Sequence, residues 1–319
     1  MVLKGKKILI TGGAGFIGSH LAEKILWTLQ PASVLVFDNF CASRHTNIEH
    51  LLADDRFELV TGDIRDYDVL EPLMERCEIV FHLAASKLVV SAQRPRLDLE
   101  TNIIGVFNIL QLARKYNRHL LYTSTGSVLG SSDIPMDEEY SCNPTTLYGI
   151  SKLTAEKYCK FFHREYGLPV TILRYFHVFG PRQDYSGGAG VVSIFLSRVL
   201  DNQPTVVYGS GEQVRCFTFV EDAVDATLMV MEKEETVGEL YNVASDKRVP
   251  VKQLARIIIE KYGRPGMQIE YGPARPGENL KPIPDTRKIE KLGWRAKISF
   301  EQGLEKTRQW IIELRKKQA

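Results

Sequence analysis

Three glycines at three-residue spacing, Gly12, Gly15 and Gly18, lie between a short apolar run and a segment of helical periodicity. The run at 7–11 predicts a β-strand, and 16–29 predicts an α-helix. In such a unit the first glycine allows a tight turn, the second lets the backbone approach a pyrophosphate, and the third lets the helix pack on the strand. The N–H groups at the helix N-terminus then bind the phosphates. We therefore expect a dinucleotide site at this turn.

Strands and helices continue to alternate after this unit. Further strands are expected at 34–37, 57–60, 79–83, 119–123 and 170–176, with helices at 101–116 and 147–166. The C-terminal part favours helices at 191–200, 251–262 and 301–316, strands near 206–208 and 240–243, and a Pro/Gly-rich stretch at 263–285. This order predicts right-handed βαβ units. The expected α/β fold is a Rossmann-like doubly wound parallel sheet with a smaller C-terminal α/β substrate lobe. The domains expected are 1–174, with chain returning near 216–245, and 175–319.

Charge and cysteine usage exclude several classes of protein. The 319 residues carry 41 basic and 39 acidic side chains, a net charge of +2, which gives no reason to expect nucleic acid or a membrane surface as partner. No signal-peptide pattern or membrane-spanning run is visible, so we expect a cytoplasmic protein. The five scattered cysteines form no Cys-x-x-Cys pair and the histidines show no His-x-x-x-His spacing. We therefore expect no disulfide framework and no structural metal.

Acidic residues at predicted strand ends indicate which dinucleotide binds. Asp38 ends the second strand, twenty residues beyond Gly18. A carboxylate there accepts hydrogen bonds from the adenosine ribose and repels a 2′-phosphate, which favours NAD over NADP. Asp63 ends the third strand and is expected beside the adenine. A capping role for Asp38 and a structural role for Asp63 are the alternatives.

A tyrosine and a lysine four residues apart predict the catalytic group. Tyr148 and Lys152 share one helix face. A free tyrosine has a pKa of about 10, too high for a base near neutrality. A nearby ammonium and the positive nicotinamide ring of oxidised cofactor favour the phenolate, so we expect the two together to lower the pKa of Tyr148. Thr125, after the strand at 119–123, is expected to hydrogen-bond the same substrate oxygen. A solvated Tyr–Lys pair on a surface helix is the alternative.

Together these motifs resemble the extended short-chain dehydrogenase/reductase family, in its nucleotide-sugar epimerase/dehydratase branch. The matching positions, in order, are 11–18, Asp38, 62–63, 82–85, Asn102, 124–125, Tyr148 with Lys152, 174–182, 215–222 and 275–278. The resemblance implies a tightly held NAD. It also implies removal of hydride from a sugar carbon, usually C4, to give a 4-keto sugar that is then reduced or processed.

The resemblance assigns the site residues. The implied cofactor contacts are Gly12, Gly15, Phe16, Ile17, Gly18, Asp38, Asn39, Asp63, Ile64, Leu83, Ala84, Ala85, Asn102, Tyr148 and Lys152. The implied substrate contacts are Thr125, Gly126, Ser127, His177, Arg215, Arg275 and Ile283. The two arginines would grip the nucleotide diphosphate, because guanidinium groups bind phosphate at two points. A surface ion pair is the alternative for either arginine.

The residues after Thr125 discriminate between reactions. The 4,6-dehydratases of this family carry Asp-Glu there, and the UDP-glucuronate decarboxylases carry Glu at the second position. This chain has Gly126 and Ser127, which cannot do that acid/base work. We therefore favour a 4-epimerase acting on a nucleotide sugar, most simply a UDP-sugar. A dehydratase, or a UDP-glucuronate decarboxylase/epimerase, remains the alternative.

Other positions bear on the sugar and the assembly. His177 stands where the family usually has Asn. Ile283 stands where an aromatic residue of the epimerases blocks a bulky 2-substituent, so UDP-GlcNAc/UDP-GalNAc are expected beside UDP-glucose/UDP-galactose. The helices at 101–116 and 147–166 are expected to form a homodimer through a four-helix bundle. Rival functions are a non-enzymatic NAD-binding regulator and a dehydrogenase of a small hydroxy compound.

Overall fold

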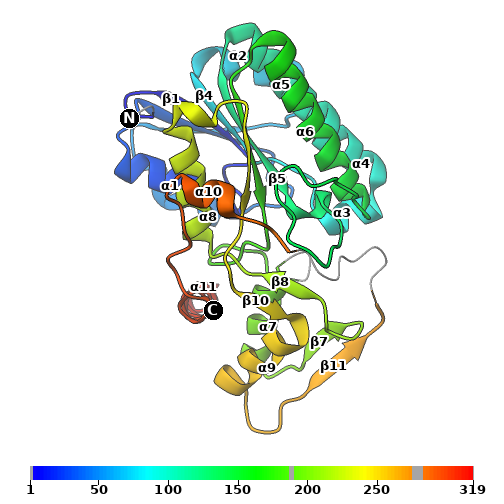
Figure 1. The fold of residues 1–319 in the computed structure, drawn as a ribbon. Helices are drawn as coiled ribbons and strands as arrows, with labels where there is room; N and C mark the ends of the chain where they lie inside the picture. The colour runs from blue at the N-terminus through cyan, green and yellow to red at the C-terminus, as the bar shows by residue number, and fades with distance from the viewer. Residues whose placement is uncertain (1–2, 187–189, 275–282, 319) are drawn as a thin grey trace. The chain divides into compact units, whose positions relative to one another are not determined.

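The computed structural model describes residues 3–186, 190–274 and 283–318 (Figure 1). The chain divides into two compact units. The first unit holds Met1–Thr125, Leu147–Arg174 and Val224–Tyr241. The second unit holds Gly126–Thr146, Tyr175–Ala223 and Asn242–Ala319. The chain therefore leaves the first unit directly after Thr125 and returns to it at the start of the helix that carries Tyr148.

A seven-stranded sheet in the order β3-β2-β1-β4-β5-β6-β9 confirms the predicted doubly wound α/β fold. Its strands are β1 Lys7–Thr11, β2 Ser33–Asp38, β3 Phe57–Thr61, β4 Ile79–His82, β5 His119–Thr125, β6 Val170–Tyr175 and β9 Leu240–Val243. β1 pairs in parallel with both β2 and β4. The strand order reverses there, so the carboxyl ends of these strands flank a crevice of the kind that binds ligands in open α/β sheets.

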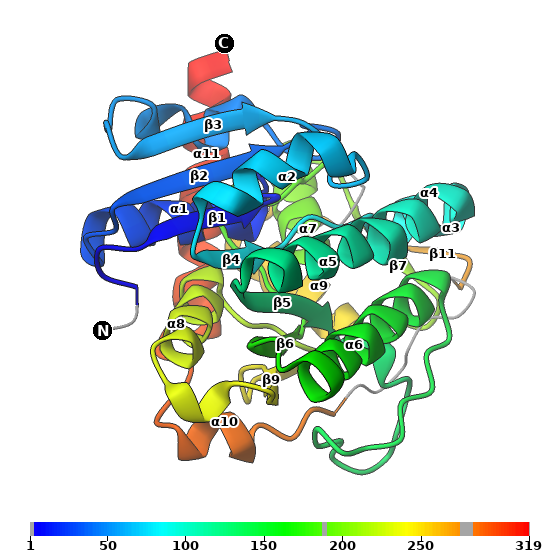
Figure 2. The ribbon, with the colours of Figure 1, turned by 90° about the horizontal axis from the view of Figure 1, so that it is seen from above.

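Helices and buried apolar strand residues build the core of the first unit. The helices are α1 Phe16–Thr28, α2 Tyr67–Arg76, α3 Leu88–Gln93, α4 Pro95–Leu99, α5 Val106–Tyr116, α6 Leu147–Tyr166 and α8 Val220–Met231, the last of which continues from the second unit. A π-helical turn, Glu100–Gly105, leads into α5. α2, α5 and α6 lie in a row on one face of the sheet (Figure 2). Their buried side chains, such as Leu73, Leu112 and Phe162, share one cluster with Leu120 of β5.

The second unit contains two small sheets and four helices in its described residues. Its elements are α7 Val191–Leu200, β7 Thr205–Tyr208, β8 Val214–Cys216, β10 Arg248–Pro250, α9 Val251–Tyr262, β11 Ile269–Gly272, α10 Arg287–Lys291 and α11 Phe300–Gln318. β8 pairs antiparallel with β10, and β7 pairs in parallel with β11. β11 lies inside the stretch at 263–285 for which the sequence predicted no strand. None of the helices in the described ranges is long and apolar enough to cross a membrane.

Candidate active site

The glycine turn after β1 has no room for side chains. Gly12 has a φ of +71°, and a Cβ there would lie 2.6 Å from the backbone nitrogen of Ala84. A Cβ on Gly18 would lie 2.7 Å from the Cα of Gly13, and one on Gly15 would lie 3.0 Å from the carbonyl oxygen of Gly12. The bare turn thus offers the backbone approach that a pyrophosphate needs, with α1 beginning at Phe16 and continuing through Ile17.

Asp38 is fixed beside this turn at the carboxyl end of β2. Its side chain is only 8% exposed. One carboxylate oxygen accepts a hydrogen bond from the Ala14 N–H at 3.0 Å, and the other accepts from the Phe40 N–H at 2.9 Å and the Ser43 hydroxyl at 2.8 Å. An ionised carboxylate has about four acceptor positions, so it keeps capacity for a ribose hydroxyl. The geometry therefore fits the cofactor that the sequence predicts.

Asp63 and Asn39 are joined at the neighbouring strand ends. The Asn39 amide donates to Asp63 at 2.8 Å, and Arg65 forms an ion pair with the same carboxylate at 2.9 Å. Burial opposes ionisation of Asp63, but the hydrogen bonds from Arg65 and Asn39 outweigh it and lower its pKa to about 2. Asp63 is therefore an anion throughout the physiological range. Its contact with adenine stays a prediction, as does that of Ile64.

Asn102 ties the loop after β4 to helix α6. Its side-chain oxygen accepts from the Ser86 N–H at 2.8 Å, and its amide donates to Asp98 at 2.7 Å and to Ser151 at 3.2 Å. The same loop carries three expected cofactor contacts, Leu83, Ala84 and Ala85. Since protein groups take the polar atoms of Asn102, its effect on a cofactor would come through the loop that it holds.

Lys152 and Tyr148 are brought together with Thr125 in the first unit. Lys152 is 2% exposed, and its ammonium donates to the carbonyl oxygen of Thr123 at 2.6 Å. Burial lowers the pKa of Lys152 to about 8. The Thr125 hydroxyl is hydrogen-bonded to the phenol of Tyr148. The three side chains proposed for catalysis thus lie at the carboxyl end of β5 and the first turns of α6.

In the protein without ligands, the pKa of Tyr148 is raised and not lowered. Burial raises the pKa of Tyr148 to about 12, although the hydrogen bond from Thr125 works in the opposite direction. The ammonium of Lys152 is directed at the Thr123 carbonyl instead. Sequence spacing gave the shared helix face, but it could not give the depth at which the phenol is buried.

The second unit brings His177 and Arg215 together. His177 has a φ of +42°, and its ring packs edge-on against Phe217 with 6.2 Å between centroids. Burial, together with the positive charge of Arg215, holds the pKa of His177 well below its usual value. Arg215 is 9% exposed in β8. The histidine that replaces the usual asparagine is therefore a neutral ring beside a guanidinium.

Backbone pairing fixes Ile283. Its carbonyl oxygen accepts from the Met136 N–H at 2.7 Å, and Met136 forms a parallel bridge with Pro284. The path of this segment is thus set by the strand-like contact with Met136. Arg275, the second arginine expected at the diphosphate, lies outside the described residues.

Packing leaves no room for a side chain at Gly126. The next residue, Ser127, is half-buried. A Cβ on Gly126 would overlap the aromatic ring of Phe176. A larger side chain at this position would have to displace that ring. The residue after Thr125 is therefore small for a steric reason in this chain.

A buried ion pair between α6 and β6 was not predicted. Arg174 of β6 makes a two-point contact with Glu156 of α6, at 2.9 and 2.7 Å, and Ser124 donates to the same carboxylate at 2.5 Å. Both charged side chains are 2% exposed. Arg174 begins the matching segment at 174–182, and Glu156 follows Lys152 by one helical turn, but neither signal predicts that the two side chains pair. In the described ranges, no group of three or more His, Cys, Asp or Glu side chains is arranged to hold a metal ion.

Comparison with known proteins places this geometry in a family. UDP-glucuronic acid decarboxylase 1 of Xenopus tropicalis is 35% identical over 310 residues, covering 95% of this chain and 71% of that protein. The crystal structure of UDP-glucose 4-epimerase from Thermotoga maritima with UDP-glucose has a TM-score of 0.89 at 36% identity, covering 97% of this chain and 99% of that one. The Thermus thermophilus UDP-glucose 4-epimerase in complex with NAD has a TM-score of 0.87 at 31% identity, covering 96% and 99%.

The sequence model described as GDP-mannose 4,6 dehydratase matches residues 9–307. That range includes the glycine turn, the Tyr148–Lys152 pair and Arg215. The resemblance drawn from the sequence is thereby confirmed. The chain belongs to the GDP-mannose 4,6-dehydratase family of extended short-chain dehydrogenase/reductases, whose members include nucleotide-sugar epimerases, dehydratases and decarboxylases.

Proposed function

We propose that this chain is an NAD-dependent nucleotide-sugar 4-epimerase that acts on UDP-hexoses. The observation that carries the proposal is the hydrogen bond between Tyr148 and Thr125, beside the buried Lys152. The two residues that follow Thr125, Gly126 and Ser127, are not acidic. Gly126 cannot gain an acidic side chain without displacing Phe176. The site therefore has a group that moves a proton at a hydroxyl, but no acid/base pair for elimination at those positions.

The two units divide the work in this proposal. The first unit would hold NAD at the glycine turn, with Asp38 at the ribose, and NAD would supply reversible oxidation of the sugar at C4. Thr125 would hold the C4 oxygen while Tyr148 accepts and returns its proton. The second unit would hold the nucleotide sugar, with Arg215 at the diphosphate. The keto sugar would rotate after its oxidation, so that its other face is reduced and C4 is inverted.

The alternative reaction is decarboxylation of a UDP-glucuronate. It is favoured by the 35% identity with the Xenopus tropicalis decarboxylase. This reaction shares the oxidation step and then loses CO₂, so it needs a substrate with a carboxylate at C5. The mass of the product separates the two reactions.

The deciding experiment is a panel of UDP-glucose, UDP-GlcNAc, UDP-glucuronate and dTDP-glucose, incubated with the purified protein and NAD. We expect a product of unchanged mass that NMR identifies as the C4 epimer. Loss of water or CO₂ from any substrate would overturn the epimerase proposal.

A substitution at Ile283 tests which sugar the site accepts. The backbone of Ile283 is held by Met136, so movement of this segment cannot easily relieve the crowding from a larger side chain at position 283. We expect Ile283→Tyr to lower kcat/KM for UDP-GlcNAc by about tenfold or more, because one misfit group in a pocket changes discrimination by about 1–3 kcal/mol. Activity on UDP-glucose should change little, and Ile283→Leu is the matched control. Equal losses on both sugars would contradict the idea.

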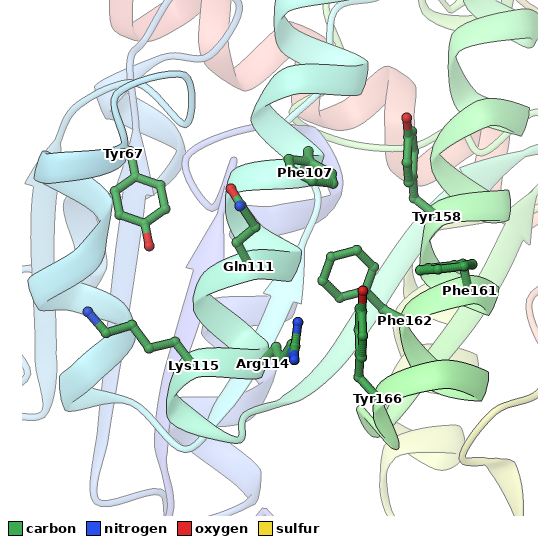
Figure 3. A pocket seen from close by; sticks show the side chains of 9 residues that line it. All are labelled: Tyr67, Phe107, Gln111, Arg114, Lys115, Tyr158, Phe161, Phe162 and Tyr166. Atoms are coloured by element: carbon green, nitrogen blue, oxygen red, sulfur yellow. The ribbon is translucent and has the colours of Figure 1, made fainter.

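An exposed aromatic surface on α5 and α6 supports a homodimer. A hollow of about 540 Å³ is lined by Tyr67, Phe107, Gln111, Arg114, Lys115, Tyr158, Phe161, Phe162 and Tyr166 (Figure 3). Phe161 is 42% exposed and Tyr166 is 43% exposed. At the N-terminal end of α6, Leu147 and Ile150 are also exposed. We propose that a second copy covers this surface with two-fold symmetry, since helix faces of this kind commonly pair.

Replacing Phe161 with glutamate tests the dimer. A charge cannot be buried without a partner, so the variant is expected to elute as a monomer while the wild type elutes as a dimer at micromolar concentration. Analytical ultracentrifugation measures both masses. Trp27→Glu is the matched control, because Trp27 is 61% exposed on α1, away from this surface. A monomeric wild type would refute the proposal.

A further inference from the structure

A buried aromatic ring faces the ammonium group of Lys152. The Nζ atom lies 4.3 Å from the ring centroid of Tyr122, which is fully buried in β5. The same ammonium donates to the carbonyl oxygen of Thr123. Glu156, one turn along α6, is paired with Arg174 instead. Lys152 therefore has a carbonyl oxygen and an aromatic face at its charged end.

The ring, rather than the hydroxyl, is the part of Tyr122 that can act here. The Tyr122 hydroxyl has no hydrogen-bond partner among the described residues. An aromatic face attracts a cation, and the attraction strengthens where water is excluded. Burial alone favours the neutral amine, so the ring opposes the loss of the Lys152 proton.

His82 completes this buried stack without adding charge. Its ring lies 5.9 Å from that of Tyr122, with 22° between the planes. Its Nδ1 atom is 2.6 Å from the Thr11 hydroxyl, just before the glycine turn. Burial and the charge of Lys152 lower the pKa of His82 to about 3, so the imidazole is neutral.

We propose that Tyr122 is a positioning residue that holds the protonated ammonium of Lys152 one helical turn from Tyr148. The catalytic part of this inference rests on the proposed epimerase function. A carboxylate paired with Lys152 would cancel much of the field of the ammonium at the phenol. An aromatic face holds the same ammonium while leaving its charge uncancelled.

Other charged groups around Lys152 set the direction of the expected effect. Burial opposes the ammonium, whereas the carboxylates of Asp98 on α4 and Glu156 on α6 favour it. Cys159 on α6 is a buried thiol whose pKa is raised, so it carries no charge there. None of these groups changes when Tyr122 is replaced. Removing the ring takes away one interaction with the charged form, so the pKa of Lys152 should fall.

The experiment follows the Lys152 side chain directly in the full chain without ligands. The protein is labelled with ¹⁵N-lysine, the Lys152 signal is assigned with Lys152→Met, and the signal is titrated by NMR. Tyr122→Phe should leave the midpoint unchanged, since only an unpartnered hydroxyl is lost. Tyr122→Leu should lower the midpoint by about one pH unit and lower kcat for epimerisation by about tenfold. Tyr122→Met replaces the leucine variant if that one does not fold.

A neighbouring variant separates positioning from general destabilisation. Leu121 is fully buried in the same strand, and its side chain points to the opposite face of the sheet. Leu121→Ala should lower the melting temperature without moving the Lys152 midpoint. An unchanged midpoint in Tyr122→Leu, or an equal shift in Leu121→Ala, would overturn the proposal. The titration needs no substrate, so it tests the role of Tyr122 separately from the epimerase proposal. If the midpoint shifts but the protein epimerises no sugar, the proposed function is rejected and the positioning of Lys152 by Tyr122 stands.

Discussion

Replacing Tyr148 with phenylalanine is expected to lower kcat for epimerisation by about 100- to 10,000-fold, the usual contribution of a positioned acid/base group. The variant loses only the hydroxyl that is hydrogen-bonded to Thr125. Tyr148 is one of the implied cofactor contacts, but the glycine turn and Asp38 are unchanged, so NAD affinity should fall far less than kcat. Single-turnover kinetics and calorimetric titration with NAD measure the two quantities separately.

The matched control for Tyr148→Phe is on the same helix. Tyr158→Phe also removes one hydroxyl from α6, but that side chain is 39% exposed and lines the hollow of the proposed dimer surface, where its ring is kept. Its kcat should equal that of the wild type. A Tyr148→Phe enzyme that keeps more than a tenth of its activity would show that another group moves the proton.

The raised pKa of Tyr148 changes what the bound state must do. With a pKa of about 12 in the ligand-free protein, the phenol is protonated at neutral pH. Proton acceptance from the sugar therefore requires that bound ligands lower this pKa, and in the proposal above the ammonium of Lys152 assists. If so, kcat should rise with pH as the phenol ionises and fall again above about pH 8, where Lys152 loses its proton. Tyr148→Phe should lack the rise.

Local sequence patterns predicted much of the fold because their causes are local. The bounds expected for the helix at 147–166 and the strand at 7–11 match α6 and β1. Apolar periodicity predicts the helix, and a short apolar run before glycines predicts the strand. The helix expected at 101–116 instead begins as the π-helical turn Glu100–Gly105, where Asn102 bonds to residues on three other segments. Two of these partners, Ser86 and Ser151, are far from Asn102 in the chain, so local periodicity does not reveal the contacts of this turn.

In the candidate site, too, features set by local sequence could be predicted and features set by distant contacts could not. The glycine spacing and Asp38 could be identified from the sequence, because the glycines lie in one continuous βα turn and Asp38 ends the next strand along the chain. The Glu156–Arg174 pair and the Tyr122 ring over Lys152 depend on how α6 packs against β5 and β6. Such contacts join residues far apart in the chain. The raised pKa of Tyr148 in the ligand-free protein could not be predicted for the same reason, since burial decides it.

Substituting alanine for Gly12 is expected to destabilise the fold by about 2–5 kcal/mol. A left-handed backbone costs a residue with a Cβ about 1–2 kcal/mol, and forcing atoms into a packed site costs about 1–3 kcal/mol more. Both apply here, because Gly12 has a φ of +71° and its Cβ would press on the backbone of Ala84. Chemical denaturation measures the loss, and NAD affinity should fall at least tenfold at a temperature where the variant remains folded.

Gly5 separates the two costs. It has the same φ of +71°, but a Cβ there would meet nothing within 4 Å. Gly5→Ala should therefore pay only the backbone cost of about 1–2 kcal/mol and bind NAD like the wild type. Equal destabilisation in the two variants would mean that the loop after β4 yields to the added methyl group. In that case the glycine at position 12 would be needed for its backbone conformation and not for the close approach to Ala84 that shapes the turn.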